Sequence, residues 1–175
     1  MKKTMLFILS SVLTLGVFAQ AVPEFRNTPM LVKADGTLGT LEKQTTEVKS
    51  KTAGGMWGAA YGGAAATMMY TVFKEVESPI RVDKSATFIV KVNEDEDPET
   101  LFNLTSAVIV KKNKTREIYT QKSGGKSVKE SYVKLKFEKV SPGVYKIIPS
   151  GLTPATEYGF ISSAKAGTVF LFGVN

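Results

Sequence analysis

The 175-residue sequence contains no histidine and no cysteine. Histidine is the usual general base near neutral pH, and both residues ligate most transition metals. Their absence excludes a Ser-His-Asp triad, thiol catalysis and disulfide bonds. A hydrolase built on two carboxylates is the alternative that stays open, although the sequence does not indicate which acids it would use. We therefore expect a protein that is not an enzyme and that has no cofactor and no metal site.

The first 21 residues have the layout of an export signal. Lys2 and Lys3 precede an uncharged stretch at residues 5–18, and two alanines follow it. A basic start, an apolar core and small residues at a cleavage point are typical of a secretory signal peptide. The core has about 14 residues, whereas a membrane-spanning helix needs about 20. We predict a signal peptide at residues 1–21 and a secreted or periplasmic chain with no transmembrane anchor and no lipid anchor on cysteine.

Segments that alternate apolar and polar residues dominate the rest of the chain. The clearest is at residues 131–140, where Val133, Leu135 and Phe137 alternate with polar residues. Such a strand, apolar on one side and charged on the other, is typical of an antiparallel sheet with one face in water. Because no long helical pattern accompanies these segments, the sequence predicts an all-β fold. We expect an antiparallel β-sandwich, with a small β-barrel as the alternative.

The segment at residues 22–53 is polar and is expected to form a separate N-terminal part. It contains Asp35 and Gly36 between two short apolar runs, at residues 30–33 and 37–41. An Asp-Gly pair in this position is a strong signal for the turn of a β-hairpin.

An uncharged tract rich in glycine and alanine follows. Gly54, Gly58 and Gly62 recur every four residues in it. Glycines at this density disfavour a water-exposed helix, so we predict a loop at residues 54–66 that leads into a strand from about Thr67. A packing surface for self-association and a membrane-associated segment are the alternatives for this tract. Residues 67–175 are then the β-sandwich domain.

Acidic residues crowd the loop at residues 93–99. Their oxygens suit Ca²⁺, but their spacing does not match an EF-hand, and we expect them to be solvated. Asp97 followed by Pro98 predicts the start of a short helical turn, with Asp97 as its N-cap.

A corner near the C-terminus carries the one family resemblance. The residues that define it are Leu152, Pro154, Thr156 and Tyr158. This spacing resembles the tyrosine corner of fibronectin type III and related immunoglobulin-like sandwiches. The resemblance implies that the tyrosine hydrogen-bonds to the backbone just upstream. An ordinary turn between strands is the alternative. The C-terminal part, ending in residues 172–175, also resembles uncharacterised exported bacterial β-domains.

Basic residues are concentrated in the second half of the chain, because residues 108–146 hold eleven Lys and Arg but three Glu. The candidate binding residues within this block are Lys111, Lys112, Lys114, Arg116, Tyr132, Lys134 and Lys136. We expect a structural or binding module of the bacterial cell envelope, with anionic glycans as candidate ligands and nucleic acid excluded by export. Self-assembly through the glycine-rich tract is the alternative function.

Overall fold

The computed structural model describes residues 21–45, 47–53, 66–122 and 132–175. The predicted signal peptide and glycine-rich loop therefore lie outside the described residues, except for one residue at an end of each. Strands dominate the described chain, so the all-β prediction is confirmed. None of the helices in this part of the chain is both long and apolar enough to cross a membrane.

The elements follow one another along the chain with short connections. The strands are β1 Met30–Val32, β2 Leu38–Thr40, β3 Glu42–Thr45, β4 Glu47–Ala53, β5 Ala66–Lys74, β6 Arg81–Val82, β7 Thr87–Lys91, β8 Phe102–Ser106, β9 Val108–Val110, β10 Thr115–Lys122, β11 Tyr132–Ser141, β12 Val144–Ser150, β13 Glu157–Ser162 and β14 Thr168–Val174. The helical turns are α2 Pro98–Leu101, η1 Lys111–Asn113 and η3 Ser163–Lys165.

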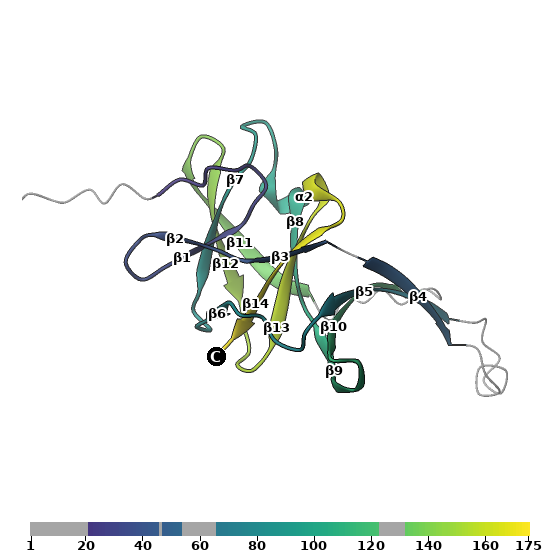
Figure 1. Cartoon of the computed structure of the whole chain (residues 1–175). Helices are drawn as coiled ribbons and strands as arrows, with labels where there is room; N and C mark the ends of the chain where they lie inside the picture. The colour runs from purple at the N-terminus through teal and green to yellow at the C-terminus, as the bar shows by residue number, and fades with distance from the viewer. Residues whose placement is uncertain (1–20, 46, 54–65, 123–131) are drawn as a thin grey trace, which may run out of the picture.

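The main sheet curls until its two edges lie close together. Its order is β2-β1-β7-β12-β11-β8-β13-β14-β3, with antiparallel neighbours throughout, and β6 adds a short parallel pairing to β14. The edge strands β2 and β3 are separated in sequence by Leu41 alone, which is buried. Because one residue joins the two edges, the sheet is nearly barrel-shaped (Figure 1).

Aromatic side chains fill the interior of the main sheet. Phe172 lies at their centre, with ring centroids 4.9 Å from Phe88, 5.6 Å from Tyr158 and 5.9 Å from Phe160. Such tilted and offset pairs stabilise beyond the area they bury. The phenol oxygen of Tyr158 accepts a hydrogen bond of 3.0 Å from the backbone N–H of Thr153. The predicted contact between this tyrosine and the backbone upstream is therefore present.

The corner around Tyr158 is closed by local contacts. Leu152 is buried in the main core, whereas Pro154 is exposed. The Thr156 hydroxyl donates to the Pro154 carbonyl at 3.2 Å, and Ala155 between them adopts a φ of 55°. Left-handed backbone at a non-glycine residue is typical of a tight turn.

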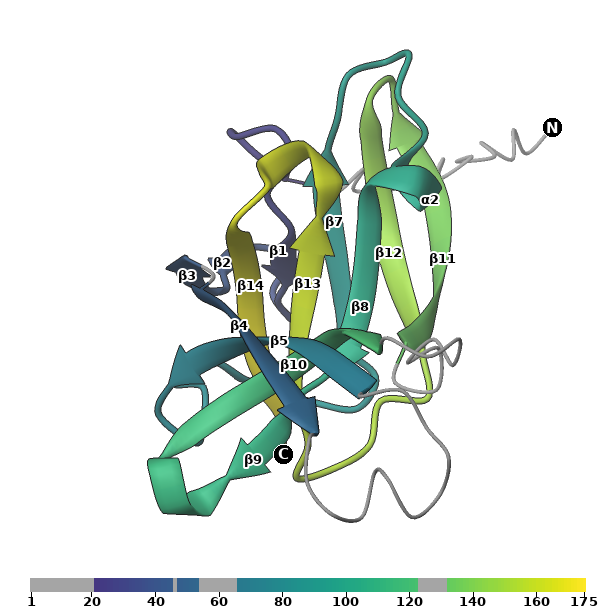
Figure 2. The same ribbon diagram turned by 90° about the vertical axis from the view of Figure 1, so that its right-hand side faces the viewer.

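A second sheet, of order β4-β5-β10-β9, packs on the outside of the main sheet. Figure 2 shows β5 and β10 running across β13 and β14. Phe73 and Ile118 from the second sheet meet Val169 and Leu171 of β14 in a small buried cluster. Strand β14 is therefore covered on both faces, which explains its apolar run from Val169 to Phe172.

Several local predictions are confirmed. The β1–β2 hairpin forms, with Gly36 at a φ of 80° in its turn. Asp97 caps α2 by accepting a hydrogen bond of 2.9 Å from the Glu99 N–H. Strand β5 begins at Ala66, close to the predicted start. Residues 22–53 are expected from the sequence to be separate from the β domain, but they supply β1–β3 to the main sheet and β4 to the second sheet.

Gly159 makes the close approach of the two sheets possible. A Cβ at this position would lie 2.7 Å from Ile118 Cδ1 and 2.8 Å from Val169 Cγ1. Real Cβ atoms do not come so close to other carbons, so any side chain here pushes the second sheet outward. A glycine inside a strand commonly marks this kind of contact.

We predict that Gly159→Ala lowers the free energy of unfolding by about 1–3 kcal/mol, because the added methyl group overpacks the interface. Urea unfolding followed by circular dichroism measures the change. The control is Gly39→Ala, since its Cβ would meet mainly the mobile end of Lys33 at 3.0 Å. Equal stability of the two variants would contradict this account of the interface.

Candidate functional site

The seven predicted binding residues lie in three different environments. Lys111 and Lys112 belong to η1, and Lys114 follows it in the turn between β9 and β10 of the second sheet. Tyr132, Lys134 and Lys136 are carried by β11 of the main sheet and are exposed. The sequence therefore predicted one basic face where the structure has two.

Arg116 is a correction to the predicted face, because its side chain is 0% exposed. The sequence places it among lysines, which predicts a surface cation. In β10, however, Arg116 and Ile118 share the face that packs on the main sheet, since side chains two residues apart in a strand point the same way. A buried guanidinium needs ionic partners, and the fold supplies two.

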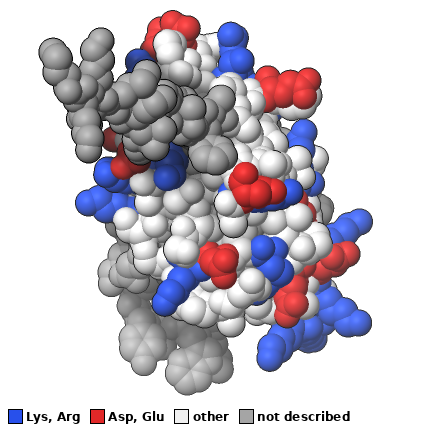
Figure 3. Space-filling view, turned by 90° about the vertical axis from the view of Figure 1, so that its left-hand side faces the viewer, with Lys and Arg blue, Asp and Glu red and all other residues white. Residues whose placement is uncertain are grey.

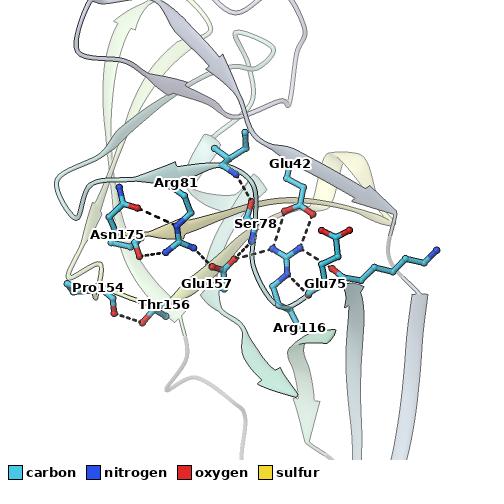
Figure 4. A network of polar contacts seen from close by, with 12 residues as sticks. Glu42, Glu75, Ser78, Arg81, Arg116, Pro154, Thr156, Glu157 and Asn175 are labelled. Carbon is cyan, nitrogen blue, oxygen red and sulfur yellow. Dashed lines mark hydrogen bonds and ion pairs between the residues drawn. The ribbon is translucent and has the colours of Figure 1, made fainter. Parts of the chain in front are cut away.

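The guanidinium of Arg116 is held between two carboxylates of the main sheet (Figure 4). Its Nη2 lies 2.8 Å from Glu42 Oε1, and its Nη1 lies 3.1 Å from Glu42 Oε2. The same Nη1 lies 3.1 Å from Glu157 Oε2. Glu42 comes from β3 and Glu157 from β13, so one side chain of the second sheet ties together two strands of the main sheet. The two-point contact with Glu42 fixes the orientation of the guanidinium plane.

Arg116 also fixes the end of β5. Its Nη2 donates to the Lys74 carbonyl and its Nε to the Glu75 carbonyl, both at 3.2 Å. Glu75 has a φ of 65°, in the left-handed region that non-glycine residues rarely adopt. The two hydrogen bonds hold the chain in this strained turn as it leaves the second sheet.

A second arginine completes the network from the other side of Glu157. Arg81 Nη1 pairs with Glu157 Oε1, and Arg81 Nη2 donates to the Val174 carbonyl at 2.6 Å. The Ser78 N–H donates to Glu157 Oε2 at 2.8 Å. Gly173 lies beneath this pair, because a Cβ there would overlap both Arg81 Nη1 and Glu157 Oε1. The two arginines and two glutamates balance in charge.

Glu42 remains ionised in this setting. Burial raises its pKa, but hydrogen bonds from Arg116, Ser78 and Gln44 and the charge of Arg116 outweigh burial, so the pKa lies below its ordinary value of 4.5. Glu157, at 2% exposed, is surrounded by donors. Both carboxylates pair with Arg116, so the network fastens the two sheets together.

The exposed row on β11 is the most regular arrangement of predicted site residues. Tyr132, Lys134 and Lys136 alternate with half-buried residues that pack on the core. Lys136 Nζ pairs with Glu138 Oε1 at 2.7 Å, and Glu138 lies directly across from Lys146 of β12. The outer surface of β11 and β12 therefore holds several lysines near one glutamate.

Two acidic residues of the loop at residues 93–99 accept hydrogen bonds from nearby backbone N–H groups. Asp97 caps α2, and Glu96 Oε2 accepts a hydrogen bond of 3.0 Å from the Asn93 N–H. In the described part of the chain, no group of three or more acidic residues is arranged to hold a metal ion. Figure 3 shows another side of the molecule, where acidic and basic side chains alternate over the surface.

No protein-family model, curated protein or solved structure matches this chain. The likeness of the corner at Leu152 and Tyr158 to fibronectin type III domains therefore stays a prediction.

Sequence reasoning missed the partners of the buried network, which are Glu42, Arg81 and Glu157. Two local signals could have indicated them. Glu157 begins a strand whose next residues are apolar, and Gly173 interrupts the apolar run of β14. A glycine at such a place indicates that another group approaches the backbone closely.

We predict that Arg116→Met lowers the free energy of unfolding by about 3–5 kcal/mol, because it leaves Glu42 and Glu157 without their shared cation. Urea unfolding at pH 7 measures the loss. The matched control is Lys136→Met, which removes an exposed ion pair and should cost less than about 1 kcal/mol. A loss as small for Arg116→Met as for the control would show that the network does not hold the sheets.

We predict that ionised Glu42 contributes to the free energy of unfolding and that this contribution is lost in acid. Its pKa is lower in the folded state than in the unfolded state, so its contribution is complete above the unfolded pKa and is lost as the pH falls through the folded pKa. Unfolding measured from pH 7 down to about pH 3 should therefore show a smaller decline for Glu42→Gln than for the unchanged protein. Glu24→Gln, which changes an exposed glutamate outside the network, is the control. Identical pH profiles for Glu42→Gln and the unchanged protein would contradict the assignment.

Proposed function

We propose that this protein is an exported, non-enzymatic binding module of the bacterial cell envelope, and that it holds anionic glycans on the outer face of β11. The observation that carries the proposal is the exposed row of Tyr132, Lys134 and Lys136 on one strand. Side chains two residues apart on a strand are about 6.6–6.8 Å apart, so the row presents two cations and an aromatic ring along about 13 Å. An extended polymer with repeated negative charges suits such a line.

The strand that carries this row is held firmly in the main sheet. Strand β11 is paired on both sides, with β12 along most of its length and with β8 at its start. Val133, Leu135 and Phe137 anchor its inner face to the core. The cations are therefore held on a regular element of the main sheet, and little ordering is needed when a ligand binds.

Charge supports the choice of ligand class. The full chain has 23 Lys and Arg against 16 Asp and Glu, and removal of the predicted signal peptide with Lys2 and Lys3 leaves a formal net charge of +5. A positive protein attracts polyanions over distances beyond direct contact, and salt weakens this attraction. Lys111 and Lys114 are less suited to the role, because they face Glu75 and Glu77 across a groove.

The non-enzymatic part of the proposal is supported by the state of the buried acids. Glu42 and Glu157 are engaged by arginines, whereas a two-carboxylate hydrolase needs acids that reach a substrate. The alternative of self-assembly rests on the glycine-rich tract, which lies outside the described residues.

We predict that the protein binds lipopolysaccharide and alginate with an affinity that falls as NaCl rises from about 50 to 500 mM, because the attraction is electrostatic. Lys134→Gln/Lys136→Gln should weaken binding at low salt by about tenfold, which corresponds to about 1.4 kcal/mol. Titration calorimetry measures both effects.

The matched control is Lys33→Gln/Lys84→Gln, which removes two exposed lysines elsewhere. A third variant, Lys111→Gln/Lys112→Gln/Lys114→Gln, tests the other predicted cluster. The proposal would be overturned if the protein bound neither glycan or if salt did not change its affinity. It would also be overturned if the control variant lost as much affinity as Lys134→Gln/Lys136→Gln. A loss confined to the third variant would move the glycan site to η1.

A further inference from the structure

Strand β9 forms a free edge of the second sheet. It pairs with β10 on one side, and no described strand lies on its other side. Its sequence is Val108-Ile109-Val110, with Val108 50% exposed and Ile109 38% exposed. Unpaired backbone groups beside exposed aliphatic side chains form a template for another strand.

The opposite edge of the same sheet is different in composition. Strand β4 carries Glu47, Lys49 and Lys51 among its seven residues. Charged side chains on an edge strand oppose pairing with another chain. Strand β9 contains no charge, so the second sheet has one edge with charged residues and one edge without them.

A groove lies at Ile109 of β9, between the chain that leaves β5 and the turn after β9. Its volume is about 520 Å³, and the residues that line it are Glu75, Val76, Glu77, Ile109, Lys111 and Lys114. Ile109 is in register with Arg116, whose side chain faces the main sheet, so Ile109 lies on that same face. Figure 2 shows β9 at the end of the second sheet, beyond the strands of the main sheet.

The walls of the groove carry opposite charges. Glu75 and Glu77 come from the chain that leaves β5, whereas Lys111 and Lys114 come from the turn after β9. Val76 and Ile109 add aliphatic surface to the lining. The groove therefore suits an apolar side chain whose neighbours along the ligand are charged with both signs.

The backbone on both walls is held in place. Glu75 and Lys114 have φ values of 65° and 52°, in the left-handed region. The Glu75 carbonyl accepts a hydrogen bond from Arg116, and the Lys114 N–H donates to the Lys111 carbonyl at 3.2 Å. Strained residues persist where the surrounding structure fixes them, so the groove exists before a ligand arrives.

We propose that this edge and its groove bind an extended segment of a partner polypeptide, which adds to β9 as a further strand. The added strand forms main-chain hydrogen bonds with β9, and every second side chain points toward the groove face. One aliphatic side chain of the partner packs against Val76 and Ile109. A basic residue of the partner lies next to Glu75 and Glu77, and an acidic residue lies next to Lys111 and Lys114. This surface is separate from the glycan-binding face on β11.

The groove favours this partner over the other occupants that could fill it. A polyanionic glycan would meet aliphatic side chains and two glutamates. A second copy paired through its own β9 would bring Lys111 and Lys112 but no acidic residue within the paired segment. A segment with an aliphatic centre and charges of both signs matches all parts of the lining.

The test uses nine-residue peptides of alternating Val and Thr that carry Lys at one end and Glu at the other, in both orders. Fluorescence anisotropy measures binding, and amide hydrogen exchange reports on β9. We expect the better order to bind the protein with a Kd below about 1 mM and to slow exchange at residues 108–110. A peptide with Pro at its centre should bind at least about tenfold more weakly, because proline cannot donate to the ladder.

The protein variant for this test is Ile109→Lys, with Val140→Lys as the matched control, since Val140 is 40% exposed on β11. We expect Ile109→Lys to weaken binding at least about tenfold and the control to stay within about twofold. The proposal is wrong if neither peptide order binds, if the proline peptide binds equally well, or if exchange at β9 does not change. A protein that is dimeric without peptide and protected at β9 would also overturn it, because a second copy would then occupy the edge. The comparison with the proline peptide needs no protein variant. It therefore tests whether the peptide adds to β9 as a strand even if Ile109→Lys fails to fold.

Discussion

The ionic contact of Arg116 with Glu42 and Glu157 is the constraint on which the arrangement of the two sheets depends. The guanidinium belongs to the second sheet, and both carboxylates belong to the main sheet. A buried charge without partners costs several kcal/mol, so the second sheet is favoured in the one position where Arg116 reaches both acids. The contact gives orientation as well as attachment, because the guanidinium also holds the carbonyls of Lys74 and Glu75 at the end of β5.

Two glycines on the outer face of the main sheet make this contact possible. Gly159 lets Ile118 approach the backbone of β13, and Gly173 leaves space for the Arg81 and Glu157 side chains. Around them, Phe73, Val169 and Leu171 exclude water from the interface. Ion pairs at the side of a dry cluster are screened less by solvent than ion pairs in water. The polar and apolar parts of the interface therefore support each other.

The position of the second sheet also determines which surfaces remain open. It covers β13 and β14 and leaves the outer face of β11 free, where the exposed lysines lie. It also carries β9, whose Ile109 lines the groove with Glu75, Val76 and Glu77. The exposed row lies on a strand that is paired on both sides, and the groove is lined by turns whose backbone is hydrogen-bonded, which limits the entropy lost when a ligand binds.

The sequence by itself determined the strands and the local turns. Three of these features depend only on residues a few positions apart: the alternation in residues 131–140, the Asp35-Gly36 turn and the cap at Asp97. They can therefore be predicted from the local sequence. The partners of Arg116 were decided by tertiary structure alone. Glu42 and Glu157 are 74 and 41 positions away from it in the chain, and only the packing of one sheet on the other brings them into contact. In the sequence, Arg116 stands among lysines, and a cluster of basic residues is typical of a face exposed to solvent. Its burial follows from the pairing of β10 with β5 and from the space at Gly159, which are long-range features that no local pattern encodes.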